Sequence, residues 1–466
     1  MATHFVFPRQ PTILAGRDDF ELSHNNLFIS ANVCTAHVIP DDIDIMRFDD
    51  ALARTLSVYP LCAGRLVRPD TIDQPWKIRL TNSGIPVQII DSDADQVTSA
   101  PDRLVQTPLT LSPSIDIFAL IDTEGTSDVD LMKITITRFT KLGRTSIGVN
   151  ASHCIADSTT HLKFMRMLSQ YYQGLDCSDP LPYYEPQASG STDDPSMAHL
   201  PQPLYDPTAR PFPWDDPSIC PPSSLFTFRM TKDQYEEIHQ HITEFSDMLD
   251  EPVRLSRLDV LIGLIARAHT ACDPKSPPIT KVMHMINQRG MGILHKDSAC
   301  NGLMGCLTQS APYTESLEHG ILAFAQQVRK TLLTLQDTNV VRGYAATVTN
   351  VQRDAAWRKK GQAFGLIDRG TIFVNSTYKF DYLSPHFGYE GRTLYYYSHP
   401  PGARFVKMLP PNPRVLPDGT FQSRKGDVEV VFFVPTDKED EMKGIISRYA
   451  KTLGVSGEIE FPAASS

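Results

Sequence analysis

A proline-rich segment near the middle of the chain constrains its fold more than any other feature. Twelve of the 36 prolines lie within residues 179–222, together with the polar stretch 189–194. Proline removes a backbone N–H donor and fixes φ, so this density excludes helices and central strands from the segment. At 466 residues, the chain is also longer than one hydrophobic core usually organises. We therefore expect two folded parts joined by an extended crossover.

Apolar residues on both sides of this segment follow helix and strand periods in alternation. Before the segment, an amphipathic stretch that ends at a proline predicts a helix over residues 48–59. After it, the pattern predicts helices at 232–245 and 258–272, and strands at 225–229, 281–287 and 426–435. Because helices and strands alternate in both halves, the predicted fold class is α/β.

One corner between a strand and a helix carries a histidine and an acid four residues apart. Residues 131–139 and 145–151 alternate in polarity and are rich in β-branched residues, which predicts two strands joined by a turn. Apolar residues then recur at helical spacing, so a helix is predicted from Ser158 with Asp157 as its N-cap. His153 therefore lies where the second strand ends. A histidine in this position can serve as a general base for acyl transfer.

The pattern His-x-x-x-Asp occurs three times, and the surroundings distinguish the three. His37 lies in a strand-like run that a proline breaks, and His269 ends a helical run. Only His153 follows a strand and precedes a helix. The alternative is purely structural, with Asp157 as a cap and His153 packed in the core. Cys154 could be a nucleophile, but its position at a buried corner favours a small packing residue.

The overall composition excludes several classes of partner. A net charge of −10 argues against a surface that binds nucleic acid or an anionic membrane. No run reaches the roughly 20 apolar residues that a bilayer requires, and the N-terminus lacks the apolar core of a secretory signal. The eight cysteines show no zinc spacing, so we expect no metal. We expect a cytoplasmic monomer with reduced thiols.

Several short motifs occur in an order and spacing that carry more information than any one of them alone. The segments are Tyr59–Arg65, Thr137–Phe139, Ser152–Asp157, Leu255–Thr270, Asn287–Gly290, Asn375–Ser376 with Phe380, and His386–Tyr389. In this order they resemble the motifs of the BAHD acyltransferases of plants and fungi. That family is part of a wider group that includes chloramphenicol acetyltransferase and the condensation domains of peptide synthetases. The resemblance extends over most of the chain.

The resemblance implies an architecture and a reaction. It implies two chloramphenicol-acetyltransferase-like domains with mixed sheets flanked by helices, at 1–178 and 223–466, joined by the crossover 179–222 and enclosing a tunnel between them. The acyl-CoA co-substrate and a small-molecule acceptor of the secondary-metabolite class enter from opposite faces, and no cofactor is bound permanently. His153 takes the proton from the acceptor hydroxyl or amine. Asp157 orients the loop and turns away to pair with an arginine.

The oxyanion of the tetrahedral intermediate also needs a hydrogen-bond donor. Asn375, Ser376 and Thr377 are the candidates, in a segment where the family has a serine followed by a tryptophan. Because Thr377 replaces that tryptophan, we expect a hydroxyl or an amide as the donor. A second departure is Ser158, which stands where the family usually has glycine.

The third departure lies at His386, two residues before Gly388, where the family has an aspartate. In the family that aspartate is structural and pairs with the arginine that matches Arg289. A protonated histidine would repel Arg289. We therefore expect Arg289 to pair with another carboxylate, with Asp381 and Asp259 as candidates, or to face solvent or the tunnel. On this hypothesis, His386→Asp should be tolerated or stabilising.

Two other functions remain open at this stage. The first is a stand-alone condensation enzyme that takes its acyl group from a carrier protein, although Ser152 stands where condensation domains usually have a second histidine. The second is a repurposed member of the fold, in which the changed block 386–391 alters binding of the acyl donor. Binding of coenzyme A would distinguish this reading from an acyl-CoA-dependent enzyme.

Overall fold

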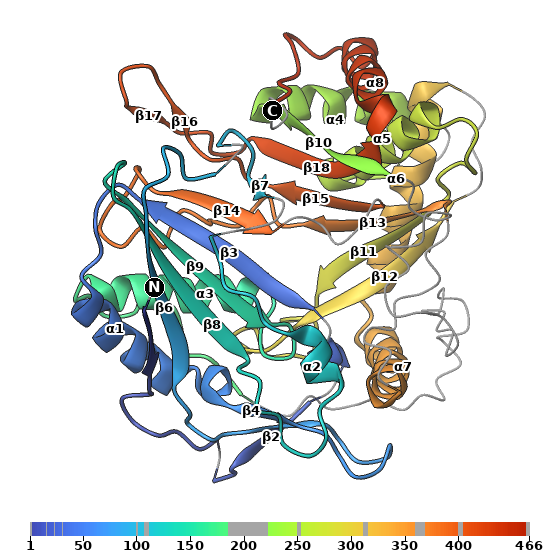
Figure 1. Ribbon diagram of the computed structural model, residues 1–466. Coiled ribbons are helices and arrows are strands. Elements are labelled where there is room, and N and C mark those ends of the chain that lie inside the picture. Colours follow the sequence, from blue (N-terminus) through green and yellow to red (C-terminus); the bar gives the residue numbers. More distant parts are fainter. Residues whose placement is uncertain are drawn as a thin grey trace.

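Two mixed β-sheets, each covered by helices, form the body of the molecule (Figure 1). This arrangement confirms the predicted α/β fold class with two sheet-containing parts. The computed structural model describes residues 2–14, 16–22, 24–29, 31–98, 101–106, 111–184, 222–248, 253–310, 316–358, 369–398 and 404–462.

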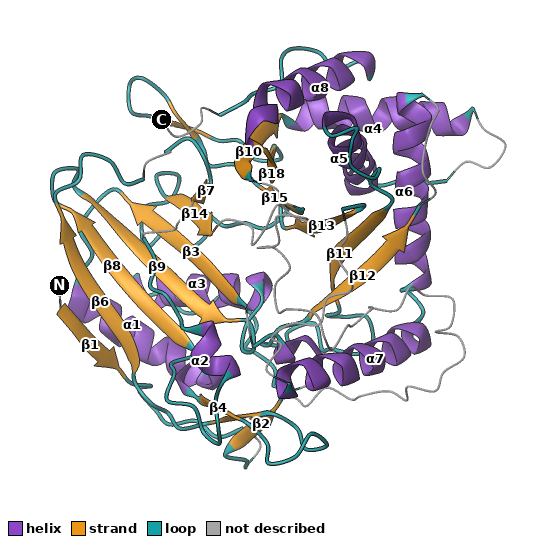
Figure 2. Ribbon diagram, turned by 45° about the vertical axis from the view of Figure 1, so that its right-hand side comes forward, coloured by secondary structure: helices purple, strands orange, loops and turns teal. Residues whose placement is uncertain are grey.

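The first sheet has seven strands in the order β1-β6-β8-β9-β3-β14-β7. Their bounds are β1 Ala2–Val6, β3 Asn32–Ile39, β6 Ile85–Ser92, β7 Val105–Gln106, β8 Met132–Phe139, β9 Arg144–Ser152 and β14 Leu394–Ser398. The antiparallel pair β8 and β9 is the strand pair that the sequence predicts. Helices α1 (Ile45–Val58) and α3 (Ser158–Tyr172) pack side by side behind this sheet (Figure 2).

The second sheet has six strands in the order β10-β18-β15-β13-β11-β12. Their bounds are β10 Ser223–Met230, β11 Lys281–Asn287, β12 Leu303–Gln309, β13 Thr371–Ser376, β15 Phe405–Leu409 and β18 Val428–Pro435. Four helices lie on its outer side (Figures 1 and 2), namely α4 Lys232–Asp247, α5 Arg257–Cys272, α6 Leu317–Thr334 and α8 Glu439–Thr452. One further long helix, α7 (Thr338–Trp357), precedes β13 and contacts the 3-10 helix η1 (His24–Leu27) of the N-terminal half.

The remaining elements are short. They are β2 Asp19–Glu21, β4 Arg65–Val67 and β5 Lys77–Arg79 in a three-stranded sheet, the hairpin β16 Arg414–Val415 with β17 Phe421–Gln422, α2 Ile117–Ile121, η2 Pro60–Ala63 and η5 Thr436–Lys438. None of the described helices is both long and apolar enough to cross a membrane.

The helices begin at residues whose side chains cap them. Asp44 accepts from the N–H of Arg47, so α1 begins three residues before the predicted start at 48. Ser256 and Asp259 form a capping box at the start of α5, with reciprocal side-chain to backbone hydrogen bonds. The strongly apolar sequence of α5 follows from its place in the core, where 11 of its 16 residues are buried.

Strand β14 departs from a strictly sequential division into two domains. It belongs to the C-terminal half of the chain, yet it pairs with β3 and β7 in the first sheet. Around it, a buried cluster joins both sheets, formed by Leu104, Val105, Leu162, Tyr382, Tyr395, Tyr397, Leu409 and Val431. The two halves are thus interlocked at this strand. Residues 185–221 of the predicted crossover lie outside the described residues, so the boundaries 1–178, 179–222 and 223–466 stay a prediction.

Candidate active site

His153 is the first residue after β9, at a tight turn that leads into α3. Its N–H donates to the carbonyl of Ala31 over 2.8 Å, which extends the β3–β9 pairing by one residue. The N–H groups of Ile155 and Ala156 donate to the carbonyl of Ser152 at 3.1 and 3.3 Å and close the turn. Backbone hydrogen bonds therefore fix the position from which the imidazole projects.

Asp157 caps α3, and its carboxylate is fully buried and fully used. Oδ1 accepts from the N–H of Thr160 at 2.9 Å and from Nη2 of Arg289 at 3.2 Å. Oδ2 accepts from Nη1 of Arg289 at 2.6 Å and from the N–H of Gly302 at 3.0 Å. Burial alone would raise the pKa of Asp157, but Arg289 and these hydrogen bonds hold it below its usual value. With these lone pairs occupied, the geometry favours a carboxylate that orients the loop over one that receives a proton from His153.

Arg289 follows β11 and is held from all sides. Besides Asp157, its guanidinium donates to the carbonyls of Ser298 and Cys300 at 2.8 and 2.6 Å, and to the hydroxyl of Thr160 at 2.9 Å. A Cβ atom on Gly302 would lie 2.6 Å from Nη1 of Arg289, so only glycine fits beside the guanidinium. The segment 298–302 and the first turn of α3 thus enclose this ion pair.

Arg289 pairs with another carboxylate and Asp157 pairs with an arginine, both as expected, but the two candidates named as partners of Arg289 were wrong. Asp259 is buried at the start of α5, where its Oδ2 accepts from Nε of Arg329 at 2.8 Å. Asp381 is exposed, and its carbonyl accepts from Ser384. The error has a physical reason, because Asp157 supplies the carboxylate and the aspartate that the family has at position 386 is not needed to neutralise Arg289.

His386 and Gly388 lie at the other end of α3. Nδ1 of His386 accepts from the N–H of Gly388 at 3.2 Å, and Gly388 has a φ of 97° that favours glycine. Between them, Phe387 packs its ring against Tyr172, and its N–H donates to Ser169 Oγ at 2.8 Å. Both partners belong to the last turn of α3, whereas Asp157 precedes the first. The hypothesis that His386→Asp would restore a pair with Arg289 therefore loses its basis.

Burial sets the protonation state of the His153 imidazole. Nδ1 is buried, whereas His153 as a whole is half-buried. Phe28 contacts the ring edge-on, with centroids 6.3 Å apart. Burial lowers the pKa of His153 to about 4, against the attraction of Asp157 and with a smaller contribution from Lys407. The imidazole is therefore neutral at pH 7 and able to accept a proton.

Residues from the second sheet approach the same corner. Lys407, whose positive charge would lower the pKa of His153, pairs with Asn375 in the parallel register of β13 and β15. The next residue, Ser376, has a buried hydroxyl with no hydrogen-bond partner among the described residues. Thr377 ends β13 through a hydrogen bond from its N–H to the carbonyl of Met408. The end of β13 thus presents amide and hydroxyl groups close to the histidine corner.

Tyrosines connect this end of β13 with α3. Burial raises the pKa of Tyr382 to about 12, and the hydroxyl groups of Thr377 and Ser158 beside it oppose the rise. Ser158, where the family usually has glycine, lies with its hydroxyl 3.0 Å from that of Tyr397 on β14. The serine therefore adds a polar contact between α3 and β14 that glycine cannot make.

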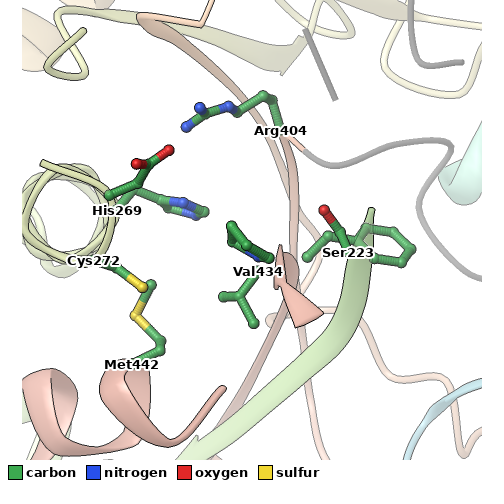
Figure 3. Close-up of a pocket in the computed structure, with 9 residues that line it drawn as sticks. Ser223, His269, Cys272, Arg404, Val434 and Met442 are labelled. Carbon is green, nitrogen blue, oxygen red and sulfur yellow. The ribbon is translucent and has the colours of Figure 1, made fainter. Parts of the chain in front are cut away.

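The other histidines with an acid four residues on have different surroundings. His37 is buried, and its Nε2 lies 2.9 Å from the carbonyl of Tyr382, whereas Asp41 is exposed and accepts from Tyr389. His269 lines a small cavity of about 20 Å³ behind the second sheet, together with Cys272 (Figure 3). Neither pair combines a strand end, a capping carboxylate and an arginine.

Cys154 is fully buried, with its Sγ 3.1 Å from the hydroxyl of Ser152. Burial raises the pKa of Cys154 to about 12, although the hydrogen bond from Ser152 opposes the rise. A protonated thiol in this place is a packing residue and a poor nucleophile.

Comparison with known proteins agrees with this architecture. A family model described as the transferase family matches residues 2–435. The chain belongs to this family, the BAHD acyltransferases. A hydroxycinnamoyltransferase from Narcissus pseudonarcissus is 27% identical over 220 residues, which are 44% of this chain and 46% of that protein. The match thus spans about half the length of this relative.

Two solved structures share the fold along nearly the whole chain. Vinorine synthase is 15% identical with a TM-score of 0.60, and 98% of each chain is covered. TRI101 of F. graminearum, in complex with coenzyme A and deoxynivalenol, is 13% identical with a TM-score of 0.62, and the match covers 96% of this chain and all of that one. The resemblance inferred from the motifs is therefore confirmed at the level of family and fold.

Sequence reasoning missed several residues of this BAHD site. Thr160 and Gly302 enclose the Asp157–Arg289 pair, and Lys407 lies beside the histidine corner. A threonine and a glycine carry no local pattern that marks them. Lys407 does carry one signal, because a lysine within an otherwise apolar strand is unusual.

Proposed function

We propose that this BAHD protein transfers an acyl group from an acyl-CoA thioester to a hydroxyl or amine of a small-molecule acceptor, with His153 as general base. The observation that carries the proposal is a neutral imidazole held at a strand end, beside a carboxylate committed to Arg289. Two solved TRI101 structures with this fold are complexes with coenzyme A and a small molecule, which supports the class of substrates.

In the proposed reaction, the acceptor oxygen or nitrogen attacks the thioester carbonyl while Nε2 of His153 takes its proton. The C–S bond then breaks, and the imidazolium returns the proton to the thiolate of coenzyme A. Positioned base catalysis of this kind contributes about 10²- to 10⁴-fold. Asn375, Ser376 and Thr377 are the candidate donors to the oxyanion, and the Ser376 hydroxyl, which has no partner among the described residues, supports that role. Asp157, with Arg289, positions the loop.

The proposal also covers the compartment, the oligomeric state, the cofactors and the partners of the protein. We infer a cytoplasmic monomer that acts on secondary metabolites, without a permanently bound cofactor, and with neither nucleic acid nor membrane as a partner. The net charge of −10 supports the last of these assignments, because nucleic acids and anionic membranes attract basic surfaces.

The test is acyl transfer measured by mass gain and by release of free thiol, with a panel of acyl-CoAs and mixed alcohols and amines. We expect His153→Ala to fold and to lose at least about 10²-fold in turnover. The matched control is His269→Ala, which removes another buried imidazole, on the helix-covered side of the second sheet. Near-normal activity of His153→Ala on a confirmed substrate would refute the general base.

Thermal shift separates this function from its alternatives. Coenzyme A should raise the melting temperature, because a ligand that binds the native state stabilises it. A repurposed protein would show no shift, and an enzyme with a carrier-protein donor would transfer from the loaded carrier and not from acyl-CoA.

A further inference from the structure

Lys407 is a buried lysine whose side chain spans the two halves of the molecule. It lies on β15 in the second sheet and is only 7% exposed. Its Nζ atom lies 3.2 Å from the centroid of the Tyr397 ring, on β14 of the first sheet. Its side chain therefore reaches across to the wall that also carries the histidine corner.

The amine of Lys407 has no carboxylate partner among the described residues that would stabilise its protonated form. Three other deeply placed basic side chains differ, because each pairs with a fully buried acid. Arg289 pairs with Asp157 and Arg229 with Glu429, and Arg329 pairs in the same way with Asp259. A ring face compensates a buried charge less completely than a carboxylate does.

The titratable groups that face Lys407 are uncharged near neutral pH. Burial raises the pKa of Cys34, on β3, to about 11, and it raises the pKa of the Tyr397 hydroxyl far above its ordinary value. Burial likewise lowers the pKa of His153 to about 4. None of these three groups carries a negative charge near neutral pH. None of them therefore offsets a positive charge on the Lys407 amine.

We propose that Lys407 recognises an anionic group, a carboxylate or its equivalent, on one of the two substrates. The assignment rests on the proposed function and deepens it, since it predicts which acyl groups or acceptors the site prefers. The anion can come from the acyl chain or from the acceptor. In either case the substrate supplies the charge that the protein does not, and a charge-assisted hydrogen bond to Lys407 orients it beside His153.

Binding of such a substrate should be coupled to a proton. Burial lowers the pKa of Lys407 well below its ordinary value. An arriving anion favours the charged form of the amine, so its binding should take up a proton from the buffer. A neutral substrate of the same shape should bind without this uptake.

The kinetic test compares matched substrate pairs. In the donor arm, succinyl-CoA is paired with butyryl-CoA, which carries a methyl group in place of the carboxylate. In the acceptor arm, hydroxy acids are paired with their methyl esters. The variant is Lys407→Met, which replaces the amine with an unbranched, uncharged side chain one atom shorter. The control is Lys379→Met, because Lys379 is exposed and lies 5.6 Å from the ring of Tyr378.

We expect the wild-type protein to prefer the carboxylate member in one of the two arms. Lys407→Met should lower kcat/KM for that member by at least about 10-fold and for its neutral partner by less than about 3-fold, as expected when one charge-assisted hydrogen bond is lost. Lys379→Met should change neither. Equal losses on both members of the pair, or no wild-type preference in either arm, would overturn the assignment.

Two further readouts keep the test decisive. If Lys407→Met does not fold, calorimetry of the wild-type protein in buffers of different ionisation enthalpy measures proton uptake directly, and equal uptake for both members of a pair overturns the proposal. If no acyl-CoA supports transfer and coenzyme A causes no thermal shift, the proposed function itself fails. Transfer without a carboxylate preference overturns only the role of Lys407.

Discussion

At the scale of single residues, the pair of Asp157 and Arg289 joins the two halves of the chain at the histidine corner. The carboxylate is completely buried and the guanidinium is 4% exposed. Removing one member of such a pair leaves the other as an uncompensated buried charge, which is costlier than losing the attraction alone.

We therefore expect Asp157→Asn to lower the free energy of unfolding by about 3–5 kcal/mol, even though asparagine caps a helix as well as aspartate does. The control is Asp44→Asn at the exposed cap of α1, which should change stability by less than about 0.5 kcal/mol. Urea denaturation measures both. Equal effects of the two substitutions would show that Asp157 acts only as a cap.

The pH dependence of this pair has a definite sign. The pKa of Asp157 in the folded protein lies below its ordinary value of 3.8. Its contribution to stability is therefore complete above that ordinary value and is lost as the pH falls through the lower, folded-state pKa.

The strand and helix around His153 and Asp157 were predictable from the sequence, whereas the residue that pairs with Arg289 was not. A strand that ends at His153 and a helix capped by Asp157 follow from local periodicity, and the structure has both. The family resemblance implied that Asp157 pairs with an arginine, but Asp259 and Asp381 were wrongly named as candidates for Arg289, because Asp157 and Arg289 lie 132 positions apart and local patterns do not report contacts over such separations.

At the scale of elements, α5 and α6 pack unusually closely at Gly263. A Cβ atom at this position would lie 2.6 Å from the carbonyl oxygen of Ile321 on α6. Glycine lowers the intrinsic stability of a helix, so its presence in the middle of α5 is explained by the space that α6 occupies.

We expect Gly263→Ala to destabilise the protein by about 1–3 kcal/mol, because the two helices must move apart. In α8, a methyl group on Gly444 would meet no atom within 4 Å, so Gly444→Ala should stabilise by roughly 0.5–1 kcal/mol. The two melting temperatures should thus shift in opposite directions. A stabilising Gly263→Ala would contradict the close packing described for α5 and α6.

At the scale of the whole molecule, several histidines on different strands and helices are buried as neutral imidazoles. Burial lowers the pKa of His37, His153 and His284 to about 4, and that of His161 and His269 to about 3. The unfolded chain binds protons at these residues below pH 6.5, whereas the folded chain does not.

Stability should therefore fall as the pH is lowered from 6.5 toward 4, with each histidine contributing up to about 1.4 kcal/mol per pH unit. Urea denaturation at pH 7.5, 6.5, 5.5 and 4.5 measures the slope. His284→Gln should flatten it, since that imidazole no longer titrates in the unfolded chain. A stability that is constant between pH 6.5 and 4.5 would contradict neutral burial.

The two-part architecture was predictable because the proline-rich segment and the alternating periods are strong local signals. Strand β14 shows where such signals end. A run of tyrosines predicts a strand, but which sheet it joins depends on its pairing with β3, which lies about three-quarters of the chain length earlier in the sequence. The environment of Lys407 was unpredictable for the same reason. Its neighbours come from β3, from β14 and from the histidine corner, which are far apart in the sequence.

The position of β14 also has a consequence for synthesis. Strand β3 cannot receive its C-terminal neighbour until roughly 250 residues after β9 have been added, which at about 5–20 residues per second takes tens of seconds. During that interval a growing chain presents an open edge of β3, the kind of edge that invites pairing with other polypeptides. The last fifth of the chain thus completes a sheet that the first third began.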